Sequence, residues 1–335
     1  MIEMGGTVLE RFSEFNQANL IPGEKKCYVL ELFETVGRQL TVEVLAVKGH
    51  RPGSVLLAAA GVHGDEYEGI FAVRRLFEEL KPEEMSGTFL GIPVCNTLAF
   101  ENLSRETPVY ADGLNLAREF PGNPSGSYTQ RLADALMSFA LRNLRSGADA
   151  LIDLHSSGTR YEYLPMMGAH LTACFEREKE LCRATGFSNL WELNKNPKSL
   201  NGAASAAGVV SLGAEVAGRG GARVGDIRIY ADALRGLCGY MGIAPYPYTI
   251  REGAFLPAHT QKFEHSGLFL SSRELGCMLH QGDQIGVLYD PQCEAMETLT
   301  AACDGVLWGI RRHVAVYAGE VAYILAKKNA EEGLT

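Results

Sequence analysis

The sequence has no long apolar run: no segment approaches the roughly 18 apolar residues in a row that a membrane-spanning helix needs. It also has no excess of basic residues, since 31 lysines and arginines stand against 40 aspartates and glutamates, which gives a net charge of −9. That balance argues against the basic footprint of a nucleic-acid-binding protein and against a polybasic membrane surface. We therefore expect neither a nucleic acid nor a membrane as a partner.

The eight cysteines form no C-x-x-C pair. The start of the chain, MIEMGGTVLERFSEFNQ, is too polar for the apolar core of a secretory signal. Both features predict reduced thiols and a cytoplasmic protein. With 335 residues, of which 46% are hydrophobic, the chain can build one large domain or a large domain with a small one. The sequence leaves open whether it forms a homo-oligomer.

Strand and helix patterns alternate through the first 250 residues. Two alternating segments around a short turn predict an antiparallel hairpin, at 27–35 and 39–48. Four nearly continuous apolar runs are typical of strands buried on both faces, at 54–62, 87–95, 148–155 and 209–216. Apolar residues at three-to-four spacing predict helices at 67–80, 128–144, 171–185 and 224–237. This alternation favours an α/β sandwich with a mainly parallel sheet over residues 1–250.

From residue 251 to 335 the chain consists of short strand patterns, glycines and turns, which predict a small all-β domain. Residues 281–286, QGDQIG, resemble a turn of lipoyl- or biotinyl-carrier folds, and CDGVLWG favours a barrel-sandwich-like shape. The hairpin around DPQCEAMET has no lysine, so we expect no covalently carried cofactor. We expect this domain to be structural or to shape access to a site. The Gly/Ala/Ser-rich residues 201–211 predict a flexible loop before a strand.

The stretch AAAGVHGDEYEGI places His63 and Glu66 directly after an apolar strand. Strand ends that open into a loop and a helix are where α/β folds place their sites. Zinc accepts imidazole nitrogen and carboxylate oxygen, so these two side chains can form part of a metal site. The alternative is a plain strand-to-helix turn, in which an acidic residue is favoured by the helix dipole.

A third ligand is available at another strand end. LIDLHSSG places His155 at the end of an apolar strand, and Asp153, two residues earlier, lies on the same face of that strand. A single histidine at a strand end is more often a satisfied polar residue than a metal ligand. The combination with the H-x-x-E pattern favours a metal site.

A third apolar strand, VVSLGAEVAG, ends in the carboxylate of Glu215. Burying a charge there is costly without a partner or a task. Glu215 therefore either pairs with a nearby arginine such as Arg219 or acts as a general base beside a metal.

The loop at 104–122 carries Arg105, Asn115 and Arg118, which are suited to polarising a carbonyl or holding an anion. The alternative is a solvated connection without a function.

The order H-x-x-E, then R…NL-x-R-x-FPG, then a strand-end DLHS and a strand-end glutamate resembles the succinylglutamate desuccinylase/aspartoacylase family, relatives of the zinc carboxypeptidases. The resemblance spans roughly residues 50–245. It implies a three-layer α/β/α sandwich with a mainly parallel mixed sheet, and one zinc ion per chain held by His63, Glu66 and His155.

The same resemblance implies roles for the other residues. Glu215 would be the general base and acid, and Arg105 would polarise the scissile carbonyl. Arg118 would hold a substrate carboxylate. Asn115 stands where the carboxypeptidases have a carboxylate that orients their first histidine, and it would also contact the substrate. Asp153 would orient a metal ligand in the same way.

One position departs from the family pattern. The family usually reads N-L-N-R-x-F-P-G, whereas this chain has Ala117 in place of the second asparagine. A methyl group cannot donate a hydrogen bond, so the grip on a free α-carboxylate is expected to be weaker, unless another group such as Arg160 supplies it. This counts against a true carboxypeptidase but leaves the metal site untouched.

The sequence thus predicts a zinc-dependent amidohydrolase that removes an N-acyl group from a small amino-acid-like substrate. A peptidase of the carboxypeptidase type would share the same metal site and would differ by preferring peptides. A non-enzymatic binding protein that retains a metal pocket would have lost the base or a ligand, and this chain retains both.

Overall fold

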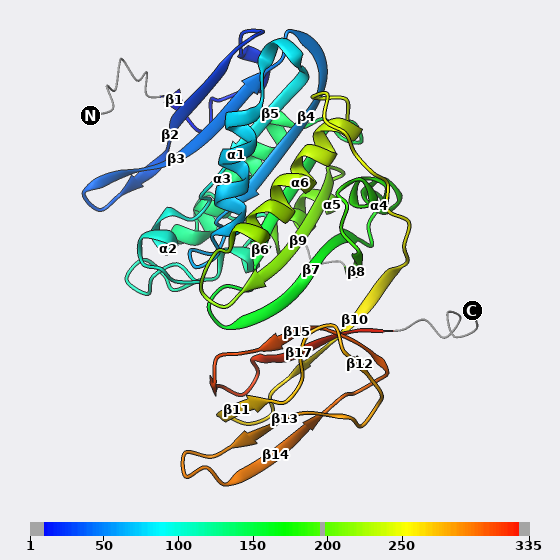
Figure 1. The fold of residues 1–335 in the computed structure, drawn as a ribbon. Coiled ribbons are helices and arrows are strands. Elements are labelled where there is room, and N and C mark those ends of the chain that lie inside the picture. The colour runs from blue at the N-terminus through cyan, green and yellow to red at the C-terminus, as the bar shows by residue number, and fades with distance from the viewer. Residues whose placement is uncertain (1–9, 195–197, 328–335) are drawn as a thin grey trace.

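The computed structural model describes residues 10–194 and 198–327 (Figure 1). Residues 1–9, which begin the polar segment discussed above, and residues 328–335 of the expected β domain lie outside the described residues. Among the described residues, one sheet contains 13 strands in the order β1-β2-β3-β5-β4-β6-β9-β7-β8-β10-β17-β15-β12, and a second contains four, β14-β13-β11-β16.

The centre of the large sheet is built from the four predicted apolar strands. They are β4 (Arg51–Ala60), β5 (Ser86–Ile92), β6 (Ala150–Ser156) and β9 (Val210–Gly218), paired in parallel in the order β5-β4-β6-β9. Alternate residues of β4 enter two different apolar clusters, Leu56 and Ala58 one of them and Val55 and Leu57 the other. Both faces of the sheet are therefore buried, which is why these strands read as unbroken apolar runs.

Helices cover both faces. One apolar cluster contains residues of α1 (Glu68–Glu79), α4 (Phe175–Ala184) and α6 (Val224–Tyr240), and the other contains residues of α3 (Tyr128–Asn143) and α5 (Leu200–Ala206). Figure 1 shows α1 and α6 side by side on the near face. Shorter helical segments are α2 (Thr97–Glu101), η1 (Gln17–Asn19), η2 (Pro82–Glu84) and η3 (Leu116–Arg118). None of the described helices is long and apolar enough to cross a membrane.

The prediction of a flexible loop at 201–211 is wrong, because α5 occupies Leu200–Ala206. Ser199 caps the helix, accepting a hydrogen bond from the N–H of Gly202 at 3.2 Å. The helix ends before Gly208, whose φ of 88° suits only glycine. Ala203 and Ala204 pack in the apolar core, but such small residues give no strong amphipathic pattern. The sequence therefore does not indicate this helix.

The hairpin at one edge of the sheet agrees with the sequence. It consists of β2 (Lys25–Thr35) and β3 (Arg38–Lys48), with β1 (Glu10–Arg11) beside β2. Two strands were not predicted, β7 (Tyr161–His170) and β8 (Asn189–Leu193). β7 runs antiparallel to β9, and Pro165 in its middle obscures the strand pattern.

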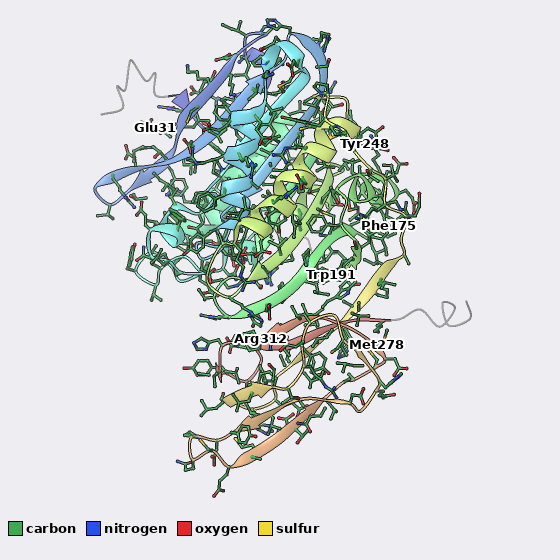
Figure 2. The ribbon with its side chains drawn as sticks, in the orientation of Figure 1. Glu31, Phe175, Trp191, Tyr248, Met278 and Arg312 are labelled. Atoms are coloured by element: carbon green, nitrogen blue, oxygen red, sulfur yellow. The ribbon has the colours of Figure 1, made fainter. Side chains whose placement is uncertain are left out.

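After residue 250 the described chain contains strands only. They are β10 (Phe255–Lys262), β11 (Gly267–Ser271), β12 (Met278–Leu279), β13 (Gln284–Tyr289), β14 (Ala295–Thr300), β15 (Gly305–Arg311), β16 (Ala315–Val316) and β17 (Val321–Lys327). β10 pairs with β8, β17 with β10, β15 with β17, and β15 also with β7, so these strands close a ring through the main sheet. Trp191 and Arg312 lie at this junction (Figure 2).

A buried carboxylate ties the beginnings of two central strands together. Asp149, 1% exposed, accepts a hydrogen bond from the N–H of Val55 at 2.8 Å and from the N–H of Arg145 at 2.7 Å. Asp149→Ala is expected to lower the free energy of unfolding by about 2–4 kcal/mol, because it leaves a buried N–H of β4 without a partner. Denaturant unfolding followed by circular dichroism measures this.

Arg145→Ala is the matched control. The Arg145 side chain is 62% exposed and donates to Asp149 from Nε at 2.9 Å and from Nη2 at 2.8 Å. The substitution removes these two bonds but keeps the N–H of Val55 paired, so a smaller loss than that of Asp149→Ala is expected. Equal losses for the two variants would contradict the assignment of the stabilisation to the Asp149–Val55 contact.

Candidate metal centre and substrate cavity

The first two candidate ligands lie in the turn between β4 and α1. His63 and Glu66 are 2% and 3% exposed, and Nδ1 of His63 lies 2.9 Å from Oε1 of Glu66. Gly64 between them approaches the backbone of Ala99 so closely that a Cβ would overlap with it. The turn is therefore pressed against α2, which holds both side chains at the carboxyl edge of the sheet.

The third candidate ligand comes from the end of β6. Nδ1 of His155 lies 2.9 Å from Oε2 of Glu66, and the N–H of Ser156 donates to the same oxygen at 3.0 Å. One carboxylate thus lies between two imidazoles from different strand ends. Their ligand atoms all lie within 4.8 Å of one another, and no other such group of three or more His, Cys, Asp or Glu occurs in the described part of the chain.

The outer nitrogens of both imidazoles face oxygen atoms. Nε2 of His63 lies 3.1 Å from Oδ1 of Asn115, and Nε2 of His155 lies 3.2 Å from Oδ2 of Asp153. The Tyr230 hydroxyl donates to the backbone oxygen of His155 and fixes that end of β6. Nδ1 of each ring lies against Glu66 at the centre of the group, while the nearby oxygen favours the proton on Nε2, the arrangement that metal-ligating histidines require.

The charges of the three groups depend on one another. Burial acts to raise the pKa of Glu66, but His63 and His155 outweigh it and hold the pKa well below its usual range. Burial acts to lower the pKa of His155, but Asp153 and Glu66 raise it well above its usual range. Burial and the nearby Arg105 lower the pKa of His63. A bound metal cation would displace the proton from Nδ1 of a protonated imidazole, because ligation needs the lone pair of Nδ1.

Two imidazole nitrogens and a carboxylate oxygen fit zinc. Ligand atoms on a tetrahedral zinc ion lie about 3.3 Å apart, given metal–ligand distances near 2.0–2.1 Å. The two Nδ1–Oε distances of 2.9 Å run to different oxygens of Glu66, and the ligand atoms all lie within 4.8 Å of one another, so the three side chains are close enough to share one ion. These three donors leave a position for water, as catalytic zinc sites do.

Glu215 lies beside this group, opposite His155 in the register of β6 and β9. Its Oε2 has no hydrogen-bond partner among the described residues, and the side chain lines a cavity of about 180 Å³. Burial raises the pKa of Glu215 to about 8. The alternative ion pair with Arg219 is wrong, because Arg219 pairs with Glu162.

The loop at 104–122 brings Arg105, Ala117 and Arg118 to the same cavity. Nη1 of Arg105 donates to Oε1 of Glu66 at 2.6 Å, and Nη1 of Arg118 donates to the backbone oxygen of Ala117 at 2.7 Å. Asp112 anchors the loop, since its carboxylate accepts from the N–H of Thr129 at 2.7 Å at the start of α3. The loop is therefore more than a solvated connection.

The structure brings all eight candidate residues of the sequence analysis together. Arg160 is not among the cavity residues and pairs with Glu320 at 3.4 Å. The sequence pattern does not reveal the other wall of the cavity. This wall is formed by residues of β7, of β8 and of the segment around α5, namely His170, Trp191, Leu193, Asn194, Ser199 and Asn201. These residues lie in or next to β7, β8 and α5, none of which the sequence pattern predicts. Only a prediction of those three elements would have pointed to this wall.

Comparisons with known proteins agree with this geometry. Residues 52–239 match the model of the succinylglutamate desuccinylase/aspartoacylase catalytic domain, which confirms the resemblance seen in the motifs. The chain is 28% identical over 290 residues to the N-alpha-acetyl-L-2,4-diaminobutyric acid deacetylase of Halomonas elongata, covering 82% of each protein.

Solved structures show the same mixed α/β fold. A succinylglutamate desuccinylase/aspartoacylase from Rhodobacter sphaeroides aligns with a TM-score of 0.79 at 24% identity, covering 91% of this chain and 96% of that one. The product-bound ectoine utilization protein EutE (DoeB) from Ruegeria pomeroyi aligns with a TM-score of 0.82 at 22% identity, covering 92% and 98%. The predicted α/β class is therefore confirmed, and the alignments extend over the C-terminal strands as well.

The geometry leads to a prediction about metal content. The purified protein is expected to contain about one zinc ion per chain, and His63→Ala and His155→Ala are each expected to lose it, because each removes one of only three protein ligands. Atomic emission spectroscopy of the dialysed proteins measures the content. His265→Ala is the control, since that side chain is 61% exposed in the C-terminal strands. Stoichiometric zinc in the His63/His155 double variant would place the metal elsewhere.

Proposed function

The chain belongs to the succinylglutamate desuccinylase/aspartoacylase family and is a hydrolytic deacylase, and we propose that it is a zinc-dependent amidohydrolase that removes an N-acyl group from a small amino-acid-like substrate. The observation that carries this proposal is the position of Glu215. Its unpartnered carboxylate oxygen lies in a cavity directly beside a buried group of two imidazoles and a carboxylate. This combines a metal site with a free base.

In the proposed enzyme, His63, Glu66 and His155 hold one zinc ion. When bound, zinc supplies a Lewis acid that lowers the pKa of water and polarises the acyl carbonyl. Asn115 and Asp153 keep the two imidazoles in the orientation that ligation needs.

Glu215 is proposed to move the proton. Its Oε2 accepts a proton from the attacking water and returns it to the nitrogen of the leaving amine as the amide bond breaks. A pKa of about 8, raised by burial, suits a group that must both take and return a proton near neutral pH.

Arg105 and Arg118 are proposed to bind the negative charges of the reaction. Arg105 lies within hydrogen-bond distance of Glu66 and faces the cavity, so its guanidinium can donate to the oxygen of the carbonyl as negative charge develops there. Arg118, further along the same loop, can hold a carboxylate of the substrate.

The size of the cavity supports a small substrate. Its volume of about 180 Å³ lies below the roughly 300–1,000 Å³ of sites for drug-sized ligands. The name of the Halomonas elongata relative, a deacetylase of an N-acetylated amino acid, supports the N-acyl amino acid class. The proposed partner of the chain is therefore a small N-acyl compound rather than a peptide.

The first prediction of this proposal concerns Glu215. Glu215→Gln keeps the shape of the side chain but cannot accept a proton. We expect turnover to fall by roughly 10²- to 10⁴-fold, the usual contribution of general acid–base catalysis, while zinc content is retained. Steady-state kinetics on N-acyl amino acids and metal analysis measure the two quantities. Turnover within a few-fold of the wild type would make Glu215 structural.

The second prediction concerns Ala117. This residue is 2% exposed and lines the cavity beside Arg118, so its methyl group stands where the family pattern has a hydrogen-bond donor. Ala117→Asn is expected to raise kcat/KM for N-acyl amino acids relative to N-acyl amines without a carboxylate. One added hydrogen bond contributes about 0.5–3 kcal/mol, which corresponds to about a 2- to 150-fold change in specificity.

Ala117→Leu is the control, because it adds similar bulk without a donor and should bring no such gain. A wild-type enzyme that strictly requires a free α-carboxylate would show that the missing asparagine does not weaken carboxylate recognition. That result would leave the zinc hydrolase proposal intact.

A further inference from the structure

Two glycines on neighbouring strands lie at one side of the cavity, and Gly213 lines it. Gly168 of β7 stands directly opposite Gly213 of β9 in the antiparallel register. A Cβ at Gly213 would overlap with Nδ2 of Asn201, and one at Gly168 would overlap with Cδ1 of Leu193. The side chains of Asn201 and Leu193 therefore lie directly against the backbone of the two glycines, which form a floor at one side of the cavity. This floor begins two residues, about 7 Å along the strand, from Glu215.

His170 also lines the cavity. It lies two residues beyond Gly168 and so on the same face of β7, and it is 2% exposed. Glu178 holds its backbone in place, because that carboxylate accepts from the N–H of His170 at 2.7 Å and from the N–H of Ser211 at 3.1 Å. Burial lowers the pKa of His170 to about 4, so the imidazole is neutral at neutral pH.

The ring of His170 offers an acceptor to the cavity. Its Nδ1 has no hydrogen-bond partner among the described residues and lies 3.9 Å from Oε2 of Glu178. Because a carboxylate can only accept, the proton of the neutral ring is favoured on Nδ1. This leaves the lone pair of Nε2 for a ligand.

Asn201 offers a donor. It is 7% exposed, and its Oδ1 accepts from the N–H of Gly202 at 2.9 Å. This bond fixes the orientation of the amide and turns the NH₂ group over Gly213 into the cavity. Within the described residues no hydrogen bond engages Nδ2, so the donor is available.

The charges of the cavity wall disfavour a substrate whose side chain ends in a charged group. Among the described residues that line the cavity, Glu215 is the only carboxylate, whereas Arg105 and Arg118 are both cationic. Glu178 lies behind His170, does not line the cavity and already accepts from two backbone N–H groups, so an ammonium group beside His170 would contact no free carboxylate. A carboxylate would meet the lone pair of a neutral imidazole.

We propose that His170 and Asn201 form an inner subsite that selects substrates whose side chain ends in an uncharged group able both to accept and to donate a hydrogen bond, such as a primary amide. This inference rests on the proposed function, since it names the substrate class of the same site. The amide oxygen of the substrate accepts from Nδ2 of Asn201, and its NH₂ group donates to Nε2 of His170.

Binding to the zinc-loaded Glu215→Gln protein tests the subsite without turnover. Isothermal titration calorimetry compares N-acetyl-L-glutamine with N-acetyl-L-glutamate, N-acetyl-L-ornithine and N-acetyl-L-norleucine, which differ chiefly in the end of the side chain. The glutamine compound is expected to bind about tenfold more tightly than each of the others, because only it satisfies both groups of the subsite. Equal affinities, or no measurable binding of any of the four, would overturn the inference.

Asn201→Asp in the same background is the sharpest variant. It keeps the shape and the acceptor for the N–H of Gly202 but replaces the donor with a carboxylate oxygen. The affinity for the glutamine compound is expected to fall about tenfold and that for the ornithine compound to rise. Asn123→Asp is the matched control, since its Oδ1 also accepts from a nearby backbone N–H but the residue is exposed and does not line the cavity. An unchanged order of affinities in Asn201→Asp would contradict the proposal.

Kinetics of the wild-type enzyme separate the two proposals. N-acetylglycine has no side chain and tests the deacylase reaction alone. If it is hydrolysed while the four compounds bind equally, the deacylase stands and the subsite is wrong. If no N-acyl amino acid is hydrolysed while the binding preference is observed, the subsite stands and the proposed function fails.

Discussion

The arrangement of the site depends on one buried carboxylate. Glu66 lies between His63 and His155, and it also receives Arg105 and the N–H of Ser156. A carboxylate that is 3% exposed cannot remain charged without such partners. Because Arg105, His155 and Ser156 are distant from Glu66 in the chain, pairing Glu66 draws the ends of two strands and the loop at 104–122 to one point.

The parallel order of the central strands makes this convergence available. β4, β6 and β9 are neighbours in the sheet, so their carboxyl ends meet at one edge and present the candidate ligands and Glu215 together. Asp112 then holds the loop at 104–122 against α3 by accepting from the hydroxyl groups of Ser127 and Thr129 at 2.8 and 2.7 Å. The side of the cavity that carries the candidate ligands is thus built from strand ends and one anchored loop.

The opposite wall depends on the strands after residue 250. β8, which carries Trp191 and Leu193, lies between β7 and β10, and β15 pairs with β7 to complete the ring. Trp308 of β15 packs with Met166 of β7 in one apolar cluster. The C-terminal strands therefore support the inner wall of the cavity through the backbone of β7 and β8, although no residue after 250 lines the cavity in the described part of the chain.

The sequence by itself determined the central strands, four helices and the ligand pattern. Continuous apolar runs can be read directly from the sequence, and so can the positions of His63, Glu66, His155 and Glu215 at the ends of such runs. The tertiary structure alone decided that Arg219 pairs with Glu162 rather than with Glu215, and that His170 and Asn201 line the same cavity. β7 carries His170 and α5 carries Asn201. Their hydrophobic patterns are weakened by a proline in β7 and by small residues in α5. Their positions follow from pairing with β9 and packing on the core, and such contacts between distant segments leave no periodicity in the sequence.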